Sequence, residues 1–254
     1  MNDDSGVRLE CAGPVATVTL CRPDVLNAQT PAMWTALSHF SRDLPGDVRV
    51  VILRAEGRAF SAGLDLSLVS GEGTNSFTEL ARLSPEESAD RIHAFQMGFT
   101  WFRRPDIVSI AAVQGHAIGA GFQLALACDL RVLADDAQLS MAEVTLGLVP
   151  DLGGTKRLVE LVGYGRAMEI CVTGRRMGAA EAERNGIANL VVPRADLDGA
   201  ARDLAAAVLS GPRDAVIEVK ALLAGAADRT YDEQDRAERE AQVRRIRDLT
   251  GHSE

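Results

Sequence analysis

Short apolar runs rich in β-branched residues recur through the first two-thirds of this chain, and stretches with helical character separate them. The strongest are Val48–Arg54 and Ile107–Val113, and Val15–Leu20 alternates as a strand does. Leu130–Ala134 and Gln138–Ser140 are expected to add two shorter strands. Because strands separated by helices usually pair in parallel, the sequence predicts an α/β architecture.

Helices are expected between these strands. Thr30 followed by Pro31 is typical of a helix N-terminus, and this helix is expected to reach about Asp43. A second helix is expected over Pro85–Arg103. The segment Ser67–Ser88 is rich in Gly, Ser and Thr, which favours a mobile surface loop beside a site, with a disordered linker as the alternative.

The chain changes character after Pro193, where the strand signal fades. Three helical stretches follow, Asp196–Leu209, Pro212–Ala224 and Tyr231–Asp248. We therefore expect residues 1–193 to form a core that carries the site and residues 194–254 to form a C-terminal helical subdomain.

Composition excludes several classes of function. The net charge of −9 argues against a nucleic-acid backbone as partner, and no apolar stretch approaches the roughly 18–20 residues of a membrane span. The four cysteines form no CxxC pair and no signal peptide is recognised at Met1–Arg8, which favours reduced thiols in the cytoplasm. None of the four histidines lies at ligand spacing from a cysteine, so we expect no metal site.

Two of the strands lead into segments of small residues. Ala59–Asp65 follows Val48–Arg54, and Gly115–Gly121 follows Ile107–Val113 and leads into an apolar helix. Small residues let a ligand approach the main chain, and a helix N-terminus offers free N–H groups. Taken alone, either segment could instead be a tight structural connection between a strand and a helix. A dinucleotide-binding loop is disfavoured, because Leu124 occupies the position of the third glycine in that motif.

Two carboxylates, Glu143 and Asp151, lie in an otherwise apolar stretch that continues to Gly153-Gly154-Thr155. A buried carboxyl has a raised pKa and can exchange protons near neutrality. An exposed turn or a helix cap is the alternative for such a residue.

These segments together resemble the enoyl-CoA hydratase/isomerase (crotonase) family in order, spacing and residue type, from about Val7 to Asp248. Arg22-Pro23-Asp24-Val25-Leu26-Asn27-Ala28 is similar to its N-terminal turn along CoA, and Glu143 matches its main catalytic glutamate. The resemblance implies a crotonase-like spiral core of ββα units and an acyl-CoA substrate, with no separate cofactor.

The resemblance also implies roles for individual residues. The N–H groups of Ala62 and Ala120 are expected to form an oxyanion hole, and Glu143, Asp151 and Gln123 to be the catalytic side chains. The expected CoA contacts are Arg22, Leu26, Asn27, Ala28, Ala59, Ala62, Gly63, Leu64, Asp65 and Gly119.

The chain differs from the hydratases that it resembles at Gln123. Those hydratases have a second catalytic glutamate at this position. Glutamine can orient a water by hydrogen bonding but cannot exchange a proton with it. A single carboxylate suits double-bond isomerisation, in which Glu143 removes a proton at C2 and returns it at C4. Asp151 matches an aspartate of the family's dienoyl-CoA isomerases, and a helix N-cap before Leu152 is the alternative.

The resemblance implies a last helix that contacts CoA beyond this point, and we expect that part of the CoA site to be missing or supplied differently. Arg244, Arg245 and Arg247 are basic candidates near the end, with a solvated helix face as the alternative. The resemblance implies a homotrimer or a hexamer.

The sequence therefore predicts a cytoplasmic acyl-CoA enzyme that stabilises a thioester enolate, with isomerisation favoured over hydration. A non-catalytic acyl-CoA-binding member and a thioester hydrolase of the same fold stay open. His116 and Ser61 are interpreted as structural, because no Gly-x-Ser-x-Gly elbow surrounds Ser61.

Overall fold

The computed structural model describes residues 5–71 and 76–251, and within them the larger sheet has six strands in the order β1-β2-β3-β4-β6-β9. β1 pairs antiparallel with β2, and the other neighbouring pairs are parallel. The strands are β1 (Val7–Ala12), β2 (Val15–Leu20), β3 (Val50–Ala55), β4 (Val108–Val113), β6 (Leu130–Ala134) and β9 (Leu190–Val192). The α/β prediction is confirmed.

A second sheet consists of three short strands in the order β5-β7-β8. β5 (His116–Ile118) is parallel to β7 (Gln138–Ser140), and β8 (Met177–Gly178) is antiparallel to β7. β5 lies within the segment that the sequence predicts as a glycine-rich turn. It was not predicted because a strand of three residues between glycines has no alternation to recognise.

Helices alternate with the strands up to β9, and after β9 the described chain is helical. They are α1 (Pro31–Asp43), α2 (Ser67–Ser70), α3 (Phe77–Arg82), α4 (Pro85–Thr100), α5 (Ala120–Ala127), α6 (Gly154–Thr173), α7 (Ala179–Arg184), α8 (Leu197–Ser210), α9 (Arg213–Gly225) and α10 (Tyr231–Leu249). The helix predicted from Thr30 is confirmed, and the Thr30 side chain accepts the N–H of Met33. The helices expected after residues 85 and 193 are confirmed as well.

The segment Ser67–Ser88 differs from the loop that the sequence predicts. It contains α2 and α3, and the start of α4. Ser76 caps α3 by accepting the N–H of Glu79, and Ser84 and Glu87 form a capping box at α4. Two serines of this segment, Ser76 and Ser84, are therefore helix caps. Residues 72–75 of this segment lie outside the described residues.

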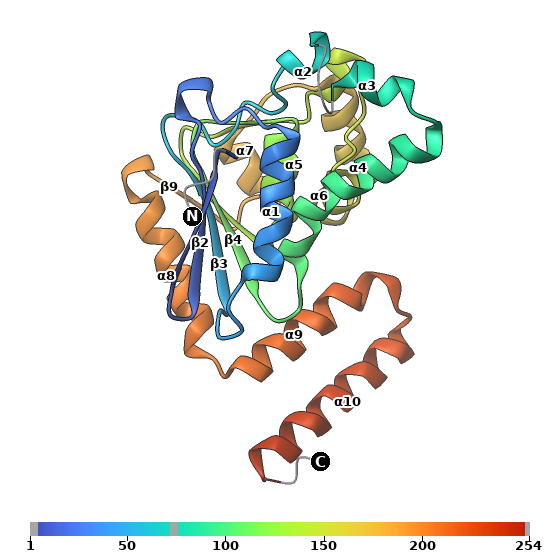
Figure 1. Ribbon diagram of the computed structural model, residues 1–254. Coiled ribbons are helices and arrows are strands. Elements are labelled where there is room, and N and C mark those ends of the chain that lie inside the picture. Colours follow the sequence, from blue (N-terminus) through green and yellow to red (C-terminus); the bar gives the residue numbers. More distant parts are fainter. Residues whose placement is uncertain (1–4, 72–75, 252–254) are drawn as a thin grey trace.

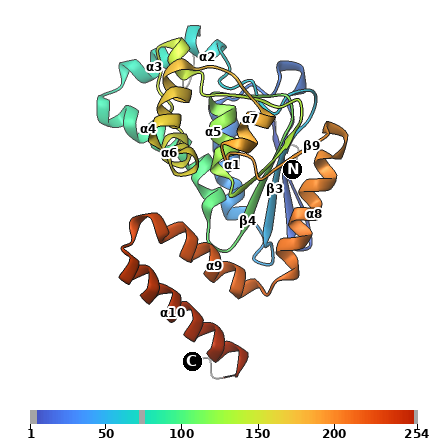
Figure 2. The same ribbon diagram turned by 180° about the vertical axis from the view of Figure 1, so that it is seen from behind.

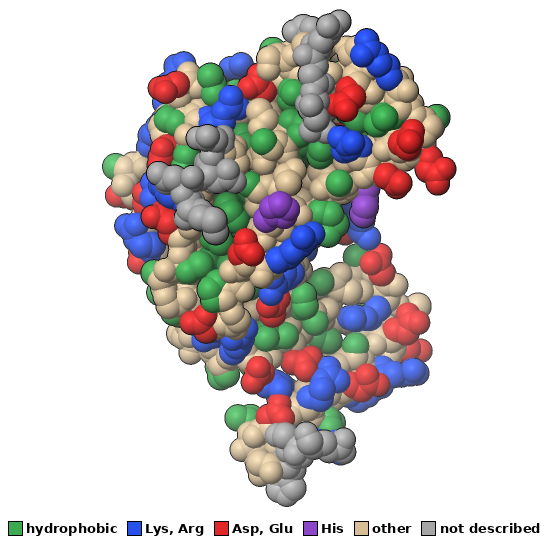
Figure 3. Space-filling view, viewed as in Figure 1, with side chains coloured by type: hydrophobic (Ala, Val, Ile, Leu, Met, Phe, Trp, Pro, Cys, Tyr) green, Lys and Arg blue, Asp and Glu red, His purple; other side chains and the backbone are tan. Residues whose placement is uncertain are grey.

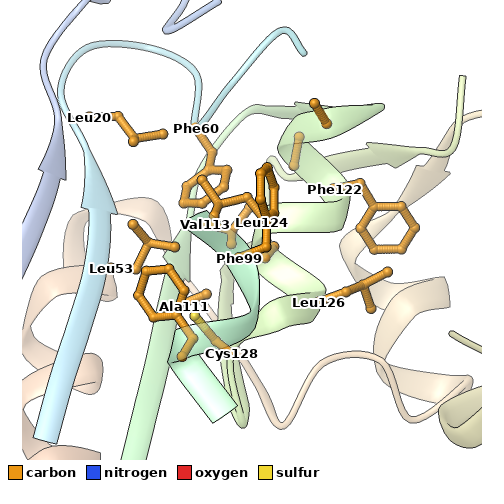
Figure 4. Packing of buried hydrophobic residues seen from close by; sticks show 14 of the residues in the cluster. Leu20, Leu53, Phe60, Phe99, Ala111, Val113, Phe122, Leu124, Leu126 and Cys128 are labelled. Atoms are coloured by element: carbon orange, nitrogen blue, oxygen red, sulfur yellow. The ribbon is translucent and has the colours of Figure 1, made fainter. Parts of the chain in front are cut away.

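The larger sheet is covered on both faces, which explains its continuous apolar strands. Along β3, Val51 and Leu53 belong to the main hydrophobic cluster, whereas Val50 and Ile52 face a second cluster with α8. Figure 4 shows Phe60, Val113 and Leu124 of the main cluster meeting between the sheet and α5. This packing fixes the carboxyl ends of β3 and β4 and the turns that follow them.

α9 and α10 extend away from the sheet in both ribbon views (Figures 1 and 2). α9 is joined to the core by Lys220, whose Nζ donates to Ile107 O and to the Asp129 carboxylate, each at 2.7 Å. Acidic and basic side chains are interspersed over both helices (Figure 3). Within residues 5–71 and 76–251, no helix combines the length and the apolarity needed to cross a membrane.

Candidate active site

A cavity of about 510 Å³ lies where the turns after β3 and β4 meet α4 and the segment after β7. One part of its wall is polar and contains the predicted residues Gln123, Glu143 and Asp151. The rest is mainly apolar and is formed by Pro31, Trp34, Leu64, Leu66, Leu68, Phe77, Leu80, Ile92, Phe95, Ile118, Leu146, Leu148, Val149 and Leu152. A largely apolar cavity with a few convergent polar groups is typical of a small-molecule site.

The two predicted turns are joined by main-chain hydrogen bonds. Ser61 pairs with the β5 strand, because its N–H donates to His116 O at 2.8 Å and its carbonyl accepts the N–H of Ile118 at 3.0 Å. Gly63 has φ +91°, and a Cβ there would lie 2.6 Å from Ile118 O. Glycine is therefore required at this position for the turns to approach so closely.

The prediction that Ala62 supplies an oxyanion donor is wrong, because the N–H of Ala62 donates to Leu26 O at 2.8 Å. The neighbouring residue Leu64 has the free group instead. Leu64 forms a parallel bridge with Gln29, in which Gln29 N–H donates to Gly63 O and Asp65 N–H donates to Gln29 O, both at 2.7–2.8 Å. In such a bridge the N–H of Leu64 itself points to the opposite side.

The second expected donor, Ala120, is the first residue of α5, and its N–H therefore lacks an intrahelical acceptor. Among the described residues, no protein acceptor takes the N–H of Leu64 or of Ala120. Both residues line the cavity. The turns therefore present two free N–H groups at one wall, one of them at the positive end of a helix dipole.

The orientation of the Gln123 amide follows from its partners. Its Oε1 accepts the N–H groups of Leu152 at 2.9 Å and of Gly154 at 3.2 Å. Two converging main-chain donors identify that atom as the oxygen, so Nε2 faces Glu143 and donates to Oε1 at 2.7 Å. Gln123 is buried, and no other orientation satisfies these groups.

Glu143 consequently has one engaged and one free oxygen. Oε1 accepts the Gln123 amide, whereas Oε2 is buried without a hydrogen-bond partner among the described residues. Burial raises the pKa of Glu143, the Gln123 hydrogen bond opposes this, and the charge of Asp151 raises the pKa further. A Cβ on Gly119 would lie 3.3 Å from Oε1, so the carboxyl lies beside the N-terminus of α5. Its free oxygen can act as a base.

Asp151 lines the same cavity, and burial raises the pKa of its carboxyl as well. The alternative that Asp151 caps a helix is wrong, because the residue at the N-cap of α6 is Gly153 and no side chain caps this end. Gln96 of α4 donates to the Asp151 carbonyl at 2.6 Å. The aspartate is thus held between α4 and α6 with its side chain near Glu143.

The residues predicted to contact CoA divide into two groups. Asn27 and Ala59 are buried, and the Asn27 amide donates to Glu56 O and Ala59 O. Arg22 forms an ion pair with Asp65 at 3.2 Å and donates to Ala28 O. These contacts hold the N-terminal turn against the turn after β3. Leu26, Ala28, Ala62 and Leu64 are partly exposed.

Three other side chains considered in the sequence make contacts within the fold. Ser61 is buried and its hydroxyl donates to Asn27 O, which agrees with a structural role for this residue. Arg244 and Arg245 contact the acidic Glu218 and Asp214 of α9. Within residues 5–71 and 76–251, His, Cys, Asp and Glu side chains form no group of three that could hold a metal ion.

Sequence reasoning missed the apolar wall of the cavity. Phe77 and Leu80 of α3 and Phe95 of α4 belong to it, together with Trp34 of α1. The sequence predicts a loop where α3 lies, and it does not indicate which face of α1 or α4 meets the site. The free N–H of Leu64 was missed because it depends on the pairing of Gln29 with Leu64, which no pattern of neighbouring residues in the sequence indicates.

Comparisons with known proteins agree with this geometry. A model of the enoyl-CoA hydratase/isomerase family matches residues 10–250. The carnitinyl-CoA dehydratase of Salmonella agona (strain SL483) is 37% identical over 226 residues, which cover 87% of this chain and 81% of that protein. A Thermobifida fusca YX protein named as an enoyl-CoA hydratase, crystallised with CoA, has a TM-score of 0.91 and 46% identity over 97% of this chain and 95% of its own. A structure from the same organism with acetoacetyl-CoA has a TM-score of 0.90 and 47% identity, covering 96% of each chain.

Proposed function

This chain belongs to the enoyl-CoA hydratase/isomerase family, and we propose that within this family of acyl-CoA enzymes it moves the double bond of an enoyl-CoA. The observation that carries the proposal is the pairing of Gln123 with Glu143, in which an amide donates to the carboxylate at 2.7 Å. Gln123 cannot release or accept a proton here, so Glu143 acts without the second glutamate of a hydratase pair.

The substrate enters the cavity with its thioester oxygen between the N–H groups of Leu64 and Ala120. The crystallised relatives that hold CoA and acetoacetyl-CoA support an acyl-CoA ligand for this site. The partly exposed Leu26 and Ala28 contact the CoA, while Asn27 and Ala59 support that turn from within. Each oxyanion donor stabilises the developing enolate, and losing one typically costs about 2.7–4 kcal/mol.

Glu143 Oε2 then removes a proton at C2 and returns it at C4, which moves the double bond without any net change in atoms. The free oxygen is suited to this task because Oε1 is held by Gln123. Asp151 is a second carboxyl in the same cavity and could accept the proton of a longer conjugated acyl group. We assign it this helper role.

Hydration is the second candidate, and the names of the structural relatives favour it. Adding water requires one group to take a proton from the water and another to supply one to the carbon. Among the described residues that line the cavity, Asp151 is the only other carboxyl, and Gln123 cannot exchange a proton with water. We therefore expect hydration to be slower than isomerisation.

Assembly and location stay predictions from the resemblance and from cysteine usage. Val243, Ile246 and Leu249 of α10 are exposed apolar side chains, which supports a trimer or a hexamer in which this helix is covered. We expect a cytoplasmic protein.

Product analysis tests the proposed reaction. We expect the enzyme to convert a 3-enoyl-CoA to the conjugated 2-enoyl-CoA, and to release little 3-hydroxyacyl-CoA from the latter, as measured by mass spectrometry and NMR. A 3,5-dienoyl-CoA tests the role of Asp151. If hydroxyacyl-CoA forms as fast as the isomer, the Gln123 argument is wrong and hydration is the activity.

The pH dependence follows from the shifted pKa of Glu143. The base must be ionised, and its pKa lies above the ordinary value of 4.5, so kcat/KM should rise with pH through a midpoint above that value. Asp151→Asn removes a negative charge that raises this pKa, so the midpoint should move to lower pH. A midpoint that stays in place in this variant would show that Asp151 does not act on Glu143.

A further inference from the structure

A buried chain of hydrogen bonds connects the wall of the cavity to the turn that carries Leu64. The Trp34 indole Nε1 donates to Gln29 Oε1 at 2.8 Å, and Gln29 Nε2 donates to Ser61 Oγ at 3.2 Å. Ser61 Oγ also accepts the N–H of Gly63 at 3.2 Å and donates to Asn27 O at 2.8 Å. Gln29 and Ser61 are fully buried, and Trp34 is 5% exposed.

The direction of every bond in this chain is fixed by chemistry. An indole N–H can only donate, so Gln29 presents its oxygen to Trp34 and its NH₂ group to Ser61. The Ser61 hydroxyl then uses both acceptor sites and its single proton. Since all these atoms are buried, removing one hydrogen-bonding group leaves its partner unsatisfied, which lowers the stability of the fold.

Trp34 is also held firmly where it borders the cavity. Its ring packs against Phe95 and Phe99 of α4, with centroid distances of 5.1 and 6.1 Å. Its main chain lies against Gly98, where a Cβ would come within 2.4 Å of Trp34 O. An acyl group that packs on the indole therefore contacts a ring that cannot shift without disturbing Gln29.

The far end of the chain reaches the oxyanion hole. Ser61 holds the N–H of Gly63, and the next peptide carries the N–H of Leu64. Gln29 reaches the same turn a second time, because its main chain forms the bridge with Leu64. The side chain and the main chain of one residue therefore both set the direction of the Leu64 N–H.

We propose that Trp34, Gln29 and Ser61 form a positioning relay, through which packing of the acyl group on Trp34 orients the Leu64 N–H toward the thioester oxygen. This inference rests on the proposed function, in which that N–H binds the substrate. The three residues do not touch the reacting atoms. Their effect should therefore fall on kcat for acyl groups long enough to reach Trp34.

Two variants break the relay at its ends. Trp34→Phe keeps an aromatic ring in the wall but removes the N–H donor, and Ser61→Ala removes the hydroxyl that joins three groups. Each should lower kcat for oct-3-enoyl-CoA by about 10- to 100-fold with a nearly unchanged KM, because small displacements of catalytic groups reduce rates to this extent. The double variant should lose little more than Ser61→Ala alone, since both changes break one chain. Leu80→Ala, which enlarges the same wall outside the relay, should instead raise KM.

A spectroscopic measurement separates this inference from the function on which it rests. Octanoyl-CoA labelled at its thioester carbonyl has no double bond to move, and its infrared carbonyl band should shift to lower frequency when it binds the wild type. The shift should shrink in Trp34→Phe and Ser61→Ala, while thermal unfolding shows that both variants fold. No shift in the wild type would refute the oxyanion assignment and the relay with it. A full shift in Trp34→Phe, strictly additive losses, or losses confined to KM would refute the relay alone.

Discussion

Replacing Glu143 by Gln should lower kcat by roughly 10²–10⁴-fold, the contribution expected of a general acid–base group, and leave the fold at least as stable at neutral pH. The amide oxygen of the new side chain can still accept the Gln123 Nε2 hydrogen bond. The variant therefore removes the basicity of the free oxygen and keeps its surroundings. Turnover of a 3-enoyl-CoA and denaturant unfolding measure the two effects.

The expected stability follows from the sign of the pKa shift. The folded state raises the pKa of Glu143, so it binds the proton more tightly than the unfolded state does. That contribution to stability is fully present below the unfolded pKa and is lost as pH rises through the folded pKa. At pH 7 the buried charge lowers the free energy of unfolding, and a neutral amide removes this effect.

Glu183→Gln is the matched control, because it makes the same change on the exposed surface of α7. It should leave both turnover and stability unchanged. Full activity of Glu143→Gln on every substrate of the wild type would contradict the assigned role. Activity lost together with the fold would show instead that the carboxylate is structural.

The reverse change at Gln123 should create a hydratase. Gln123→Glu keeps an oxygen for the N–H groups of Leu152 and Gly154 and places a second oxygen opposite Glu143 Oε1, where the amide nitrogen now lies at 2.7 Å. Two carboxyls at that distance share one proton, so one pKa of the pair is strongly raised. The pair then contains an acid and a base near neutral pH.

Hydration of a 2-enoyl-CoA should increase by roughly 10²–10⁴-fold in this variant, because general acid–base catalysis by a second group is gained. Gln123→Met provides the control, since it has similar length and no exchangeable proton. It should not hydrate faster than the wild type. Hydration that is unchanged in Gln123→Glu would mean that the missing carboxyl does not limit this reaction.

Much of the fold was predictable from local patterns. β2, β6 and β7 begin and end at the predicted residues, and in β2 alternation and β-branched residues report directly on a pleated, half-buried surface. The predicted cap at Thr30 is likewise local. β1, β9 and the long α6 were missed, and in β1 the exposed residues at its end interrupt the apolar alternation.

The sequence by itself determined the family, the two turns of small residues, and the presence of Glu143 with glutamine rather than glutamate at position 123. Those features are encoded in residue type and spacing. The tertiary structure alone decided that Leu64 rather than Ala62 has the free N–H, because this depends on Leu26 and Gln29 pairing with a distant turn. It also decided which way the Gln123 amide points and which side chains form the apolar wall. Hydrogen-bond direction and burial are properties of segments brought together by folding, and no local pattern contains them.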